Sequence, residues 1–426
     1  MTPGPGLSLT QAPPLSVPFR FYLGTPLFAL LAALLLVVQG PNALASRWMP
    51  EALAVTHLFA LGFVTQVMVG SLMQMLPVVA GAPVPRPQLV AALVHVPLAL
   101  GALLLPTFFL THWPWTLYAA IGTLGFSLAV FLFAITTSLL RASAGFPTVG
   151  GMWLATVSLG FAAGLGLLLA PMHAGLVSVV VGVRHLHPVW GLAGWVGLLV
   201  VGVSFQVVPL FQLTPPYPRV VLRFFVPVLF ATLIVGSLLD TSPMEPYVWS
   251  LLGGEFFAFA ALTTYLQQRR RRKTRDPSLG FWRTALLSLA VCSLLGVFRP
   301  FVGLGNTARV DTALVILFLM GFAGSLNLGM LLKIVPFLCW FHLQATFLGR
   351  GPVPHMGMFL GDRAGRRLLR VHQTALFLLA VSLLWAPAHR LAWSAVAVDA
   401  VWLGTLLVLA TLRYRRAVRA LAAAST

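Results

Sequence analysis

Acidic residues are scarce in this 426-residue chain. Only 8 residues are Asp or Glu, against 27 Lys or Arg, and charged residues make up 8% of the chain. A soluble domain has about a quarter of its residues charged, so the composition excludes that class. The net charge of +19 does not predict a nucleic-acid partner. The arginines cluster between apolar runs, as membrane topology requires, and we expect no nucleic acid to bind.

Cysteine is also rare, and the common catalytic motifs are missing. Cys292 and Cys339 lie in apolar segments and form no CxxC pair, which argues against a disulfide framework or a cysteine zinc site. There is no phosphate-binding GxxxxGK[ST], no HExxH and no serine-nucleophile elbow. Residues 1–17 lack the charged start and cleavage site of a signal peptide and predict a disordered tail.

Apolar runs dominate the remainder, which we treat as one transmembrane domain over residues 18–426. The chain is 59% hydrophobic, and runs of about 20 apolar residues, long enough to cross a bilayer as helices, recur throughout. We predict an all-α polytopic membrane protein with 12 transmembrane helices. The spans lie near residues 21–40, 53–79, 88–110, 115–139, 149–171, 187–211, 220–239, 247–267, 281–302, 312–338, 369–386 and 393–412.

Basic loops set the predicted orientation. The strongest is the QQRRRRKTRD stretch over residues 267–276. Cytoplasmic loops carry the excess of Lys and Arg, so this loop and both chain termini are expected in the cytoplasm. The predicted location is the bacterial inner (cytoplasmic) membrane, with lipid as the surrounding partner.

The second, sixth and tenth spans share a skeleton of two glycines, a polar residue and a proline, spaced by 8, 4 and 3 residues. We call these spans the template helices. Their copies are Gly62, Gly70, Gln74, Pro77; Gly194, Gly202, Gln206, Pro209; and Gly321, Gly329, Lys333, Pro336. This long period predicts three pseudo-equivalent four-helix units, about 18–145, 146–277 and 278–426. Small residues permit close helix packing in lipid, so the template helices are predicted to be the inner ones.

Histidines on or beside the template helices are the candidate ligands. His57 lies about one turn inside the second span, where a polar ring is costly and by default functional; the alternative is a hydrogen bond to a neighbouring helix. His185 and His187 precede the sixth span at the same level, and the third copy has no histidine. Imidazole binds heme iron, copper and zinc, so these three residues are the predicted cofactor and metal ligands.

A second tier of polar residues lies elsewhere in the spans. His95 and His372 each follow a template helix and form a candidate ligand pair or proton path, or only interhelical hydrogen bonds. Glu255 and Asp399 are candidate proton-path carboxylates, with structural pairing as the alternative. Met68, Met73 and Met75 permit a copper pathway or simple apolar filling. The remaining histidines are expected at the solvent or headgroup level: His112, His173, His342, His355 and His389.

Three units of four spans, with His57 in THLFALGF of the second span, resemble the heme–copper oxidase subunit I superfamily. The opening PFRFYLGTPLFALLAALLL is similar to its divergent single-subunit branch, the NnrS-like proteins of nitric oxide stress and denitrification. This resemblance implies heme b, with copper as a further cofactor, and respiratory or denitrification redox partners. His57 matches the axial heme ligand, and His187 is nearest to the copper ligand of the sixth span.

Other features of the superfamily are missing. The seventh and tenth spans lack the family's histidine pairs, and the cross-linked tyrosine has no counterpart, which argues against standard oxygen reduction. The sequence therefore predicts a heme-binding, and on the same resemblance copper-binding, membrane protein that handles electrons or nitric oxide. The alternatives are a transporter or assembly factor for heme, copper or a small solute without a permanent cofactor, and a scaffold that has lost its site. Enzymatic activity is left open.

Overall fold

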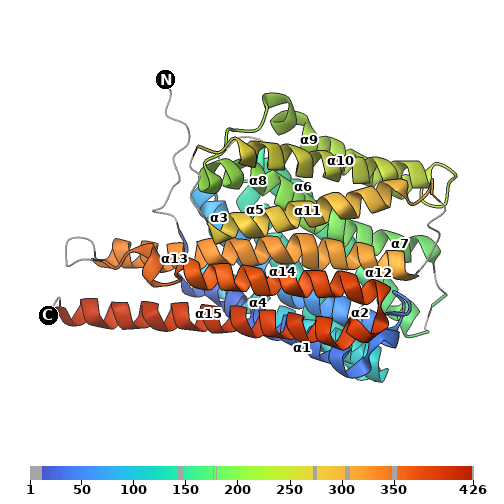
Figure 1. The fold of residues 1–426 in the computed structure, drawn as a ribbon, viewed down its shortest axis with the longest axis horizontal. Coiled ribbons are helices and arrows are strands. Elements are labelled where there is room, and N and C mark those ends of the chain that lie inside the picture. The colour runs from blue at the N-terminus through green and yellow to red at the C-terminus, as the bar shows by residue number, and fades with distance from the viewer. Residues whose placement is uncertain are drawn as a thin grey trace.

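The computed structural model describes residues 12–142, 147–175, 177–178, 180–271, 276–302, 308–347 and 353–424. Most of the predicted tail and part of the basic loop, residues 272–275, lie outside these ranges. Within them the chain is helical and contains no strand. Figure 1 shows the helices running side by side in one bundle. The helices are α1 (Ser16–Gln39), α2 (Pro50–His57), α3 (Gln66–Val79), α4 (Pro87–Thr111), α5 (Pro114–Leu139), α6 (Thr148–His173), α7 (Val181–Val189), α8 (Leu198–Gln212), α9 (Arg219–Leu238), α10 (Glu245–Gln268), α11 (Pro277–Phe298), α12 (Ala308–Val315), α13 (Ser325–Phe347), α14 (Asp362–Leu384) and α15 (His389–Ala424).

The all-α polytopic fold is confirmed. Eleven helices of the described chain are long and apolar enough to cross a membrane. The remaining predicted span, near residues 247–267, corresponds to α10, which is long enough but is not among the eleven. Glu245 and Glu255 both lie in α10 and make it less apolar than its neighbours.

Each template helix is interrupted by a π-helical segment. The segments are Leu58–Thr65 between α2 and α3, Trp190–Gly197 between α7 and α8, and Ile316–Gly324 between α12 and α13. Each contains the first skeleton glycine and ends three residues after it. A π turn is rare, widens the helix and often marks a functional site. Its threefold recurrence shows that the three copies share backbone geometry as well as sequence.

The template helices are the inner ones, as predicted. Their most apolar stretches are 72%, 72% and 78% buried, whereas no other candidate span exceeds 50%. Figure 1 shows α2, α7 and α12, where the template helices begin, near one end of the bundle. We call this the mouth; it is the end that the basic loops predict to face outward.

The skeleton glycines explain how each unit is assembled. Every one of the six lies against the first helix of its own unit, where an added Cβ would collide with a neighbour. The neighbours are spaced seven residues apart in each unit: Phe28 and Phe21 on α1, Ser158 and Gly151 on α6, and Ser288 and Phe281 on α11. Small residues allow this close approach in lipid. The glycines thus orient each template helix, and with it the side chains at the mouth.

Candidate functional site

The structure brings His57 and His187 together, although 130 residues separate them in sequence. Their ring centroids lie 6.2 Å apart, and the ring planes differ by only 14°. His57 comes from the template helix of the first unit and His187 from that of the second. Two imidazoles on opposite sides of one metal ion have centroids about 6 Å apart, since each metal–nitrogen bond is about 2 Å and each nitrogen lies about 1 Å from its ring centre.

Hydrogen bonds fix the tautomer of both rings. Nδ1 of His57 lies 2.8 Å from the Leu53 carbonyl oxygen, and Nδ1 of His187 lies 3.0 Å from that of Ala162. A carbonyl only accepts, so each Nδ1 carries the proton and each Nε2 keeps its lone pair. No hydrogen-bond partner of either Nε2 is found within the described chain. This is the arrangement by which proteins orient metal-ligating histidines.

Gly166 on α6 makes room for the second ring. A Cβ at this position would lie 3.1 Å from Cε1 of His187. The glycine therefore lets the imidazole lie against α6, where the Ala162 carbonyl is within reach. Nothing in the spacing of Gly166 from other residues identifies it in the sequence.

Phe109 and His173 complete the surroundings of the pair. The Phe109 ring centroid lies 5.2 Å from that of His57 and 5.8 Å from that of His173. The sequence predicted a solvent- or headgroup-level position for His173, at the end of α6, and did not associate it with His57. Both rings of the central pair are half-buried, and their neighbours come from α2, α4 and α6.

His185 takes no part in this pair. Instead, its ligand atom lies within 4.8 Å of carboxylate oxygens of Asp240 and Glu245. These carboxylates come from the turn after α9 and from the start of α10. Burial, together with the Glu245 carboxylate, raises the pKa of Asp240, and His185 opposes that rise. We call His185, Asp240 and Glu245 the mouth cluster.

His95 and His372 lie apart from each other, each in its own hydrogen-bonded group. His95 Nδ1 lies 2.9 Å from Gln66 Oε1. His372 is buried, with Nδ1 2.7 Å from Asp399 Oδ2 and Nε2 2.8 Å from Ser325 Oγ. Gln66 and Ser325 are equivalent positions, four residues after the first skeleton glycine. The repeat thus places one interhelical hydrogen bond at the same point in the first and third units. Such a bond was the alternative to a ligand pair or a proton path for these two histidines.

Other predicted polar residues also have local partners. Glu255 accepts a hydrogen bond of 2.7 Å from the Thr232 hydroxyl. Lys333 Nζ lies 2.6 Å from Asp276 Oδ2, which joins a template helix to the start of α11. His389 was expected at the headgroup level, but it is buried, and its Nε2 donates to the Leu36 carbonyl over 3.1 Å. That expectation was wrong because α15 packs along α1, which buries the ring at the start of α15 against α1.

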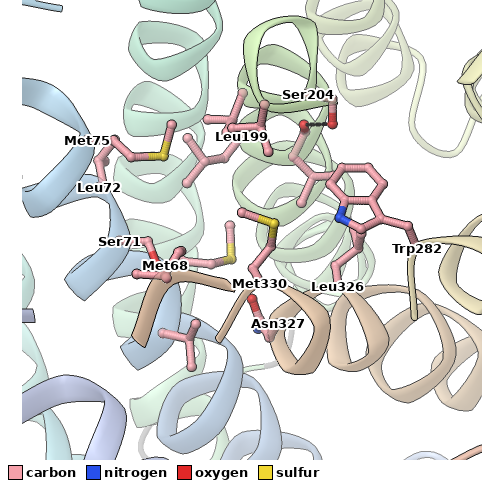
Figure 2. Close-up of a pocket in the computed structure, with 15 residues that line it drawn as sticks. Met68, Ser71, Leu72, Met75, Leu199, Ser204, Trp282, Leu326, Asn327 and Met330 are labelled. Carbon is pink, nitrogen blue, oxygen red and sulfur yellow. Dashed lines mark hydrogen bonds between the residues drawn. The ribbon is translucent and has the colours of Figure 1, made fainter. Parts of the chain in front are cut away.

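A cavity lies where α3, α8 and α13 meet (Figure 2). Its empty volume is about 600 Å³, which includes space open to the surroundings, and its walls are largely apolar. Met68, Met75 and Met330 line it, whereas Met73 is buried elsewhere. Two buried N–H donors of its wall, Asn327 Nδ2 and Trp282 Nε1, have no hydrogen-bond partner in the ranges that the structure describes. The cavity can therefore hold a small molecule that accepts a hydrogen bond.

No known family model and no curated protein matches this chain.

Proposed function

We propose that this chain is a heme-binding integral membrane protein in which His57 and His187 hold the iron of heme b between them. One observation supports this above all others: two imidazoles from different units lie nearly parallel with ring centroids 6.2 Å apart, a separation that fits one metal ion between them when both Nε2 atoms face it. A ring in a costly intramembrane position, with its Nδ1 proton fixed and its Nε2 free, is what an axial ligand needs.

The number of ligands favours heme over a zinc ion. A zinc ion takes three or four protein ligands. Among the described residues, the only group of three ligand atoms close enough together is the mouth cluster, so His173 does not complete a site with the pair. A porphyrin supplies four nitrogens itself and needs only two axial ligands. The half-buried rings and the nearby Phe109 side chain offer an apolar edge for a planar group.

When bound, heme supplies one-electron chemistry and an iron that binds nitric oxide. The chain's own contribution is the ligand pair and the two carbonyls of Leu53 and Ala162, which raise the basicity of the imidazoles. We propose a role in respiratory electron or nitric oxide handling in the bacterial inner membrane, in a divergent relative of heme–copper oxidase subunit I.

The test is the spectrum and metal content of the purified full chain. We expect a Soret band and about one iron per chain, with loss of the band in His57→Ala and in His187→Ala. His95→Ala is the matched control, because that ring also lies in a span but is bound to Gln66. A wild-type protein without heme, after expression with ample heme supply, would contradict the proposal, as would variants that retain a wild-type spectrum.

The central cavity favours one alternative, a transporter or assembly factor. Thioethers suit Cu(I), and Figure 2 shows the sulfurs of Met68, Met75 and Met330 around the space where the three inner helices meet. On this alternative, Met68→Leu weakens Cu(I) binding to the purified protein, while Met73→Leu does not, since Met73 lies outside the cavity wall. Equal binding by both variants would remove this alternative.

A further inference from the structure

The mouth cluster combines three potential metal ligands from three parts of the second unit. His185 lies on α7, Asp240 follows α9, and Glu245 begins α10. Their ligand atoms all lie within 4.8 Å of one another. Ligands about 2.0–2.2 Å from one ion are at most about 4 Å apart. Side-chain movements of less than about 1 Å would therefore bring all three ligand atoms within bonding distance of one ion.

The two carboxylates are uncompensated in a strongly basic protein. Neither is in any ion pair found in the described chain, although Lys and Arg outnumber acidic residues 27 to 8. Oδ1 of Asp240 is buried and has no hydrogen-bond donor among the described residues. A buried carboxylate oxygen without a partner is costly, and a cation between Asp240 and Glu245 would remove that cost.

The residues around the mouth cluster leave room for an ion between the Asp240 and Glu245 carboxylates. A Cβ at Gly182 would lie 2.7 Å from Asp240 Oδ2, so the glycine permits the carboxylate to approach α7. Glu245 uses one oxygen, Oε2, to accept the Thr241 N–H over 3.2 Å, and Oε1 has no hydrogen-bond partner within the described part of the chain. The nearest basic side chain in sequence, Arg184, instead lies over the Trp48 ring at 5.4 Å.

We propose that the mouth cluster is a binding site for a divalent transition-metal ion, separate from the His57–His187 pair. One imidazole and two carboxylates suit Zn²⁺, Mn²⁺ or Fe²⁺, whereas Mg²⁺ and Ca²⁺ prefer oxygen ligands alone. The ion connects α7 to the α9–α10 turn. Because α7 also carries His187, the ion steadies the element that presents this histidine.

The separation of the two sites follows from helix geometry. Residues two apart on a helix do not face the same way, so His185 and His187 serve different partners. This inference does not depend on heme binding, and its test uses a different signal.

The experiment measures binding of Co²⁺ to the chelator-treated, purified full chain through its visible d–d bands, followed by Zn²⁺ competition. We expect one site that Zn²⁺ displaces and Mg²⁺ does not. His185→Ala, Asp240→Asn and Glu245→Gln should each weaken Co²⁺ binding at least about 10-fold, the lower range seen when even outer-shell groups are removed. The control Glu51→Gln, an acid of α2, should bind as the wild type does.

Circular dichroism and size-exclusion profiles establish that each variant is folded. As a measurement on the unaltered protein, saturating Zn²⁺ should raise the unfolding temperature, since a ligand of the folded state stabilises it. Wild-type Co²⁺ affinity in all three cluster variants would overturn the proposal, as would an equal loss in Glu51→Gln. Absence of both the d–d bands and the Zn²⁺ stabilisation in the wild type would also overturn it.

Discussion

Replacing Gly202 by Ala tests whether close helix contact builds the second unit. An added Cβ would lie 2.7 Å from the Cα of Gly151 and 3.3 Å from its carbonyl carbon. Carbon atoms prefer about 3.5–4.0 Å, so the contact is about 1 Å too short. Both colliding atoms belong to backbone, and no rotamer change relieves the clash. Either α6 and α8 separate or their backbones bend.

We expect Gly202→Ala to lower the free energy of unfolding by about 1–3 kcal/mol, the usual cost of overpacking, which multiplies the unfolding equilibrium constant about 5- to 150-fold. The assay is unfolding in mixed micelles followed by circular dichroism. Gly122→Ala is the matched control, because a Cβ there meets nothing within 4 Å. Alanine also favours helix by up to about 1 kcal/mol over glycine, so the control should be neutral or stabilised. Equal stability of the two variants would refute the packing argument.

Three further predictions concern the ligand histidine, the buried pair and the start of α11. Gly166→Ala should displace the His187 ring and reduce heme occupancy measured at the Soret band, whereas Gly164→Ala, whose Cβ meets nothing within 4 Å, should not; equal occupancy would exclude steric control of the ring. His372→Leu should cost about 3–5 kcal/mol in unfolding titrations, because it leaves Asp399 buried and unpaired. Adding Asp399→Leu should recover part of this loss, and a double variant less stable than the single one would contradict that reasoning. Asp276→Ala loses both the cap on Ser278 N and the ion pair with Lys333, and should lower the free energy of unfolding by about 1–2 kcal/mol. Asp276→Asn loses the ion pair but retains a capping oxygen, so it should lose less; equal losses in the two variants would show that the cap contributes nothing measurable.

The glycine skeleton shows how much of the fold the sequence alone could predict. Apolar run lengths and the spacing of 8, 4 and 3 predicted helices, their repeat and the inner position of three of them. These properties depend on local composition and on packing between small residues, both of which are written along the chain. The π-helical segments were not predicted, since they arise where each template helix adjusts its turns to its neighbours.

For the candidate site, the sequence identified the ligand residues, and the tertiary structure decided which of them meet. The sequence by itself identified His57, His185 and His187 as ligand-type side chains at one depth, and their asymmetry among the three copies. Only the tertiary structure decided that His57 meets His187, while His185 turns to Asp240 and Glu245. The physical reason is rotational: the contacts of Gly194 and Gly202 with α6 set the rotation of the template helix, and that rotation decides which of two neighbouring histidines faces the first unit.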